Sequence, residues 1–200
     1  MKNRNIVSMA ILPALACIAL LGVKAFGLTP PPDGGYPGFN TAEGQNALFS
    51  LTTGTYNTAI GALSLRSLTD GSFCTGIGAG ALFVNTATGN TAVGGAALLL
   101  NTTGSSNTAV GAATLVHNVN GVGNTATGFQ ALFNNTGNYN TANGQLALFT
   151  NFNGVQNTAN GANALTSNTS GSNNTASGVN ALSNNTNGGV ASARGVVSKR

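Results

Sequence analysis

The side chains most able to carry out chemistry are scarce in this sequence. From residue 39 to residue 189, the acids are Glu43 and Asp70, the one histidine is His117 and the one cysteine is Cys74. Glycoside cleavage needs two carboxylates that flank the scissile bond, a Ser or Cys nucleophile would need His117 as its base, and zinc needs three or four ligands. No spacing in this segment assembles such a set. We therefore predict that the protein is not an enzyme and holds no metal and no cofactor.

These residues belong to a short repeat. The phrase Asn-Thr-Ala-x-Gly-x-x-Ala-Leu occurs nine times, at steps of 17 residues with two steps of 16. A fixed period of this size predicts stacked coils rather than one globular core. We number the repeat positions from the first residue of the phrase. The copies begin at Asn40, Asn57, Cys74, Asn90, Asn107, Asn124, Asn140, Asn157 and Asn174.

Two positions are the same in every copy. Gly at position 5 indicates a bend, and Leu at position 9 indicates a buried anchor. The glycines are Gly44, Gly61, Gly78, Gly94, Gly111, Gly128, Gly144, Gly161 and Gly178. The leucines are Leu48, Leu65, Leu82, Leu98, Leu115, Leu132, Leu148, Leu165 and Leu182.

A looser half-phrase places a second glycine after each of these leucines. We predict that both glycines of a coil are corners with positive φ, which Gly adopts at little cost. The second set is Gly54, Gly71, Gly89, Gly104, Gly121, Gly137, Gly154, Gly171 and Gly188.

The repeat predicts an all-β fold, a parallel β-solenoid (β-roll) of nine 16–17-residue coils. In an extended segment alternate side chains share a face, so positions 1, 3 and 5 point one way and positions 2 and 4 the other. The Ala-Leu segment forms the second wall, as a strand or as one short helical turn. Stacking places each Asn above its counterpart, which predicts one amide ladder at position 1 and a second along Asn85, Asn101, Asn118, Asn135, Asn151, Asn168 and Asn185.

Position 4 changes from apolar to polar along the array. It holds Ile60, Ile77, Val93 and Val110, and then Thr, Asn and Ser. Position 10, which is mostly Phe, Leu or Val, fades in the same direction. Both stripes fit a core that thins toward a polar cap, or an interface with copies of the same protein in a closed trimer or a fibre. Cys74 likewise fits either a small buried residue or a disulfide between chains.

The charge distribution and the two ends of the chain indicate which partners to expect and where the protein is located. Only 5% of residues are charged, and much of the formal charge of +4 lies near the N-terminus, so we expect no nucleic-acid partner. Residues 1–25 predict an export signal, with a retained membrane anchor or acylation of Cys17 as alternatives. Residues 26–38 predict a Pro/Gly-rich spacer without regular structure, residues 39–189 the repeat domain, and residues 190–200 a cap or a disordered basic tail.

The segment NTAVGGAALLLNTTGSSNTAVG, from Asn90 to Gly111, carries a resemblance. It resembles the head repeats of trimeric autotransporter adhesins and the Asn-Thr-Ala-x-Gly-x-x-Ala-Leu arrays of exported bacterial proteins and phage tail fibres. The resemblance implies a left-handed β-roll and, for the adhesins, association in threes.

We therefore expect a secreted or cell-surface structural or adhesive protein that associates with itself. The alternative is a binding module whose Thr/Asn ladder recognises a repetitive surface such as ice or polysaccharide, or another host or environmental surface. A membrane is a partner only if the leader is retained.

Overall fold

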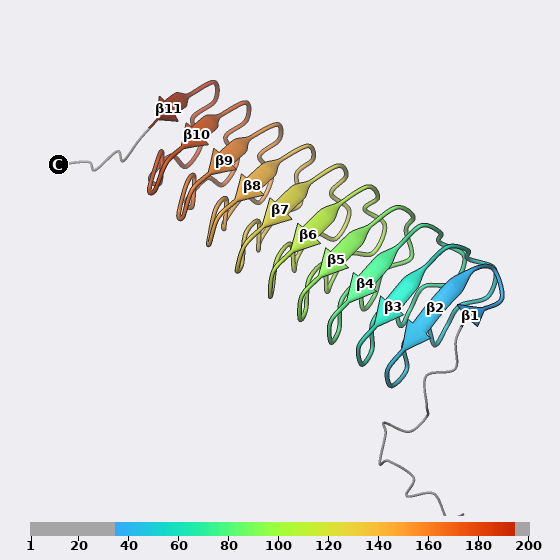
Figure 1. Cartoon of the computed structure of the whole chain (residues 1–200). Coiled ribbons are helices and arrows are strands. Elements are labelled where there is room, and N and C mark those ends of the chain that lie inside the picture. The colour runs from blue at the N-terminus through green and yellow to red at the C-terminus, as the bar shows by residue number, and fades with distance from the viewer. Residues whose placement is uncertain (1–34, 195–200) are drawn as a thin grey trace, which may run out of the picture. The chain divides into compact units, whose positions relative to one another are not determined.

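The computed structural model describes residues 35–194, which form a single 11-stranded sheet with its strands in sequence order (Figure 1). Strands β2 to β11 are parallel, one to each coil, and β1 pairs with β2 in the antiparallel direction. This confirms the predicted parallel β-solenoid. The strands are β1 (Gly35–Tyr36), β2 (Asn40–Glu43), β3 (Thr58–Ile60), β4 (Thr75–Ile77), β5 (Thr91–Val93), β6 (Thr108–Val110), β7 (Thr125–Thr127), β8 (Thr141–Asn143), β9 (Thr158–Asn160), β10 (Thr175–Ser177) and β11 (Ser192–Arg194).

The alternation of side chains in each strand follows the expected order. In β3, Ala59 is fully buried while Thr58 and Ile60 on either side of it face outward. The coils stack in register, so that Ala59 lies beside Ala42 in one direction and Gly76 in the other. Small residues at position 3 therefore bring the sheet close to the opposite wall, where the position 9 leucines lie. From Leu65 to Leu165 these leucines are fully buried.

The second wall contains neither a strand nor a helix in any coil between residues 35 and 194, so both predicted forms of this wall are wrong. It is a chain of tight turns instead. In the third coil Ala81 N–H donates to Gly78 C=O at 3.2 Å, and Asn85 N–H donates to Leu82 C=O at 3.2 Å. Leu82 adopts a left-handed conformation with φ 54°, as does every position 9 leucine. That conformation costs about 1–2 kcal/mol, and burial of the Leu side chain, which contributes about 1.5–3 kcal/mol, offsets it.

The two glycines of a coil serve different purposes. All nine position 5 glycines have positive φ, and a Cβ on Gly61 would also lie 2.7 Å from the Gly78 carbonyl carbon of the next coil. Of the second set only Gly89 has positive φ, at 71°, so that part of the prediction is wrong for the other eight glycines. These eight are needed for space alone, because a Cβ on Gly54 would lie 2.2 Å from Gly71 O. In the third coil Ala87 takes the structural position of the second glycine. The Asn85 amide donates to Ala87 O, as the Asn101 amide donates to Gly104 O in the fourth coil.

Both ends of the sheet extend past the predicted repeat. Gly35 and Tyr36, in the predicted spacer, form β1 and pair with Thr41 and Asn40. Ser192 to Arg194, in the predicted cap or tail, continue the parallel sheet beside β10. The predicted leader, the rest of the spacer and residues 195–200 lie outside the described residues. Within residues 35–194 no helix is long and apolar enough to cross a membrane.

Candidate functional site

The residues with chemical potential are distributed over different coils and rows of the rod. Glu43 lies at position 4 of the first coil, Asp70 at position 14 of the second and His117 at position 11 of the fifth. The His117 ring packs edge-on against Phe133, with centroids 4.9 Å apart, and its Nδ1 is buried without a hydrogen-bond partner. In the described part of the chain, no three His, Cys, Asp or Glu side chains gather where they could hold a metal ion.

Cys74 is fully buried and unpaired, at the place where the other copies have Asn. Its thiol lies 3.2 Å from Ala87 O, which it contacts as a donor. Burial raises the pKa of this thiol, against the lowering effect of N–H groups around the sulfur. A disulfide with another chain needs an accessible sulfur, so the structure supports the alternative of a small buried residue.

The asparagine ladders are confirmed, and they lie inside the rod. At position 1, the Asn107 Oδ1 accepts the backbone N–H of Asn124 at 2.9 Å, and its Nδ2 donates to Gly121 O at 2.8 Å. This ladder therefore joins side chains mainly to backbone. The second ladder is a true amide chain, in which Asn118 Nδ2 donates to Asn101 Oδ1 at 2.9 Å. Because these side chains are buried, they satisfy buried backbone groups and are not available to a ligand.

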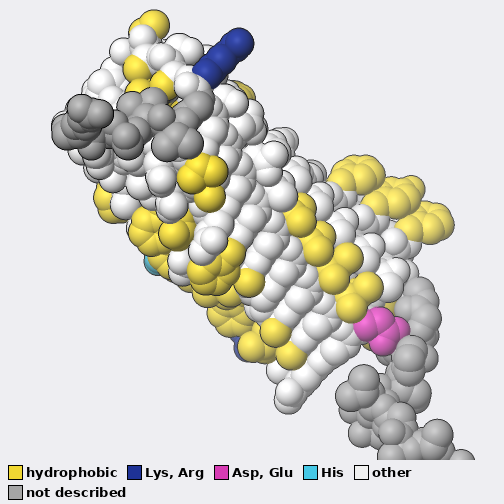
Figure 2. All heavy atoms as spheres, turned by 60° about the vertical axis from the view of Figure 1, so that its left-hand side comes forward, with side chains coloured by type: hydrophobic (Ala, Val, Ile, Leu, Met, Phe, Trp, Pro, Cys, Tyr) yellow, Lys and Arg dark blue, Asp and Glu magenta, His cyan; other side chains and the backbone are white. Residues whose placement is uncertain are grey.

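The outward-facing side of strands β2 to β11 forms a first candidate surface, which we name the outer sheet face. It consists of the residues at positions 2 and 4. Position 2 is Thr from Thr41 to Thr175, each in register with the next, and Ser192 ends the row. The predicted interface residues lie beside these threonines: Ile60 (41% exposed), Ile77, Val93 and Val110. The reading of position 4 as core is therefore wrong, and Figure 2 shows a line of apolar side chains along the rod.

Position 10 forms a second row that is partly buried. Phe133 stacks on Phe149 with centroids 5.3 Å apart. Arg66 lies in this row, between Phe49 and Phe83 of the adjacent coils. Its guanidinium carbon is 5.7 Å from the ring centroids of both Phe49 and Phe83. This geometry allows two cation–π contacts, each worth about 0.5–1 kcal/mol at an exposed site.

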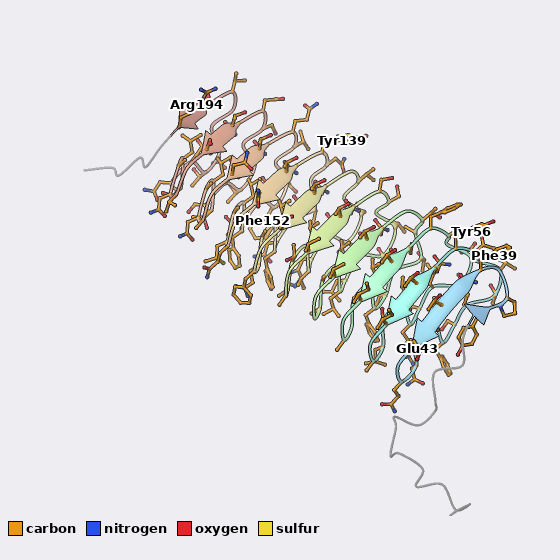
Figure 3. All side chains as sticks on the ribbon, viewed as in Figure 1. Phe39, Glu43, Tyr56, Tyr139, Phe152 and Arg194 are labelled. Carbon is orange, nitrogen blue, oxygen red and sulfur yellow. The ribbon has the colours of Figure 1, made fainter. Side chains whose placement is uncertain are left out.

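A third row, formed by the residue just before each copy of the phrase (position 17, or 16 at the end of the two shorter coils), carries exposed aromatic rings. Phe39 stacks on Tyr56 with centroids 5.1 Å apart, and Tyr56 stacks on Phe73 at 5.2 Å. Tyr139 belongs to the same row four coils beyond Phe73. Figure 3 shows Phe39, Tyr56 and Tyr139 along one edge of the rod. We name these four residues the aromatic edge.

The repeat phrase did not reveal the aromatic edge, because this position lies outside the phrase and varies among Phe, Tyr, Gly, Ser, Gln, Asn and Val. Reading that one position down the nine copies would have shown three aromatic residues in succession, at the N-terminal end of the array. The stacking itself depends on coil register and backbone conformation.

No known protein family, curated protein or solved structure matches this chain. The function must therefore be argued from the surfaces of the rod itself.

Proposed function

We propose that this protein is a secreted or cell-surface structural and adhesive rod that associates with copies of itself through the outer sheet face. The observation that carries the proposal is the exposure of Ile60, Ile77 and Val110 on a flat, regular sheet. The fold does not need apolar residues there, since Asn143 and Asn160 occupy the same position in later coils. Apolar side chains that the core does not use are a sign of a contact surface.

The lack of charge on this face supports a partner of the same kind. Glu43 and Arg194, at its two ends, are the only charged side chains that the described part of the chain places on it. An uncharged face of hydroxyl and methyl groups matches a second copy of itself better than it matches nucleic acid or an anionic membrane. The resemblance to adhesin head repeats, and the predicted export signal, support a place at the cell surface.

The size of the outer sheet face indicates how strong the association is. Nine steps at about 4.8 Å give a length of about 43 Å, and three-residue strands give a width of about 10 Å. Two such faces would bury about 860 Å², below the roughly 1,000 Å² expected of a stable specific interface. Pairing is therefore weak, and lasting adhesion depends on many rods acting together.

The test is a fourfold variant, in which Ile60, Ile77, Val93 and Val110 are all replaced by Thr, as at Thr127 in the sixth coil. Sedimentation velocity over a wide range of concentration should show association of the unaltered protein and a monomeric variant. The matched control is Asn143→Thr, which should associate normally. A monomeric unaltered protein, or a variant that associates equally well, would refute the proposal.

A second function is favoured by the row of threonines. Their strict register from Thr41 to Thr175 presents one hydroxyl and one methyl group per coil, as a repetitive solid such as ice or a crystalline polysaccharide requires. Thr91→Tyr and Thr108→Tyr would disrupt this row at its centre. If adsorption to the solid is lost while self-association persists, the threonine row is the binding surface.

A further inference from the structure

The aromatic edge is exposed to a degree that its role in the fold does not explain. Phe39 is 78%, Tyr56 52%, Phe73 61% and Tyr139 62% exposed. In other coils the same position holds Ser106, Gln156 or Asn173 without any change in the path of the chain. The aromatic rings are thus an addition to the fold.

The backbone beneath these rings is strained. Phe39, Tyr56, Phe73 and Tyr139 have φ values of 61°, 58°, 59° and 57°, which cost a residue with a side chain about 1–2 kcal/mol. The position 9 leucines recover that cost through burial, and these rings do not. The same left-handed φ occurs at Ser106, Gln156 and Asn173, so the strain belongs to the coil, and the aromatic side chains need a reason of their own. The Tyr56 N–H also donates to Gly38 O at 2.9 Å, and Phe73 N–H to Thr55 O at 3.0 Å, so each ring is attached at a fixed point.

The stack leaves the outer face of the Phe73 ring open. Within the stack the planes differ by 6° and cover each other. Beyond Phe73 the next residue in the row is Gly89, and a Cβ there would meet nothing closer than Ser106 Oγ at 3.9 Å. Farther along, the Tyr139 ring lies over Gly123, 2.8 Å from the place of a Cβ. Between Phe73 and Tyr139 the row therefore contains only Gly89, Ser106 and Gly123, with an aromatic ring at either end.

Hydroxyl groups occupy the neighbouring positions. The residues directly before Phe73, Gly89 and Ser106 carry hydroxyls: Ser72, Thr88 and Ser105. The Thr88 Oγ1 accepts the Ser72 N–H at 3.4 Å, which leaves its own O–H as a donor. The charged side chains of residues 35–194 all lie in other rows: Glu43, Arg66, Asp70 and Arg194.

From this arrangement we infer that the aromatic edge between Phe73 and Tyr139 binds a neutral oligosaccharide. The C–H face of a pyranose ring packs on an aromatic face, and its hydroxyls exchange hydrogen bonds with serine and threonine. Nucleic acids and acidic glycans need cationic groups, which this edge lacks. Phe73 and Tyr139 lie four coil steps apart, about 19 Å at about 4.8 Å per step, a span suited to a short run of sugar units. The inference rests on a different surface from the proposed self-association.

The experiment is a titration of the protein with neutral hexasaccharides, namely the β-1,4-linked hexamers of glucose, mannose and xylose, with hexagalacturonate as the anionic comparison. The chain has no Trp and three Tyr, and two of these, Tyr56 and Tyr139, belong to the edge, so tyrosine fluorescence reports directly. We expect saturable binding of at least one neutral hexamer and none of hexagalacturonate.

Three variants test the location. Phe73→Asn and Tyr139→Asn, which copy Asn173 of the eighth coil, should each weaken binding about tenfold, as expected for the loss of one stacking contact. Gly89→Tyr should also weaken binding, because its ring would cover the open face of Phe73 while the fold is kept. Gln156→Asn, at the same position outside the site, is the matched control and should bind normally.

The inference fails if no neutral hexamer binds, if hexagalacturonate binds as well as the neutral hexamers, or if Phe73→Asn and Gly89→Tyr both bind normally. It also fails if these variants alter self-association and leave sugar binding unchanged, since the edge would then be a contact between copies. Sugar binding by the fourfold Thr variant of the outer sheet face separates the two proposals, because we expect that variant to bind sugar normally.

Discussion

The first two coils and the last seven follow the same path with different chemistry. At position 12 the first two coils have Leu51 and Leu68, and from the third coil onward Asn fills this place and forms the amide ladder. The exterior differs as well, since the stacked rings from Phe39 to Phe73 lie over the first coils and polar residues occupy position 4 of the last ones. Either corner chemistry is compatible with the coil. The path is therefore set by what the two regions share, namely the stacked glycines and the buried Ala and Leu.

The largest expected effect comes from breaking that shared element. In Gly128→Ala the new Cβ would lie 2.7 Å from the carbonyl carbon of Gly144, at a φ of 125°. Overpacking and backbone strain together should cost about 3–5 kcal/mol. Denaturant unfolding followed by circular dichroism measures this cost, and hydrogen exchange should show the loss centred on the sixth and seventh coils.

Gly95→Ala is the matched control, because a Cβ on Gly95 meets nothing within 4 Å. It should change stability by no more than about 0.5 kcal/mol. Equal effects of the two changes would mean that glycine stacking does not set the path of the coil.

A smaller effect should follow from moving the corner chemistry of the first region into the second. Asn118→Leu copies Leu68, but it would leave Asn101 Oδ1 without its donor and remove an acceptor from Asn124 and Asn135. Buried polar groups that lose partners cost about 1–3 kcal/mol, so we expect a total of about 2–4 kcal/mol, measured by the same unfolding curves.

Asn185→Leu provides the comparison within the ladder. Asn185 ends the row and is only partly buried, with a single side-chain partner in the ladder, Asn168 Oδ1, at 3.2 Å. Its replacement should cost about 1 kcal/mol or less. If the middle and the end of the ladder prove equally tolerant, the amide chain contributes nothing that leucine does not.

The sequence predicts the features that are determined within one repeat, and it does not predict those that depend on contacts between coils. The period predicted the coil, and strand alternation predicted that Ala59 faces inward and Ile60 outward. The left-handed φ of the position 9 leucines had no local signal, because leucine rarely adopts it without support from neighbouring coils.

Features that arise between coils could not be predicted from one repeat phrase. Ser64 replaces the usual Ala at position 8, and its Oγ donates to Gly76 O of the next coil at 2.8 Å. Gly76 is in turn the only copy without Ala at position 3, and a Cβ there would lie 2.5 Å from that Oγ. The two exceptions therefore occur together, because the Ser64 hydroxyl occupies the space that an Ala side chain at residue 76 would need. Pairs of this kind, like the stack of Phe39, Tyr56 and Phe73, become visible only when the register of the coils is known.

A small stabilising effect is expected at Cys74, at the boundary between the two regions. Asn57 Oδ1 accepts the Cys74 N–H at 2.9 Å, but in the next coil the Asn90 N–H faces the Cys74 sulfur, which is a weaker acceptor than an amide oxygen. Cys74→Asn would complete the position 1 ladder and should stabilise the protein by about 0.5–1.5 kcal/mol, the net worth of one hydrogen bond.

Because burial raises the pKa of the thiol above its usual value of 9.0, the unfolded chain loses this proton at lower pH than the folded one. Stability should therefore fall as the pH rises beyond about 9, and the fall should be absent from both Cys74→Asn and Cys74→Ala. Only the Asn variant should also be more stable at neutral pH. Equal stabilities of the two variants there would show that the break in the ladder carries no cost, and that the two regions are joined as firmly by a thiol as by an amide.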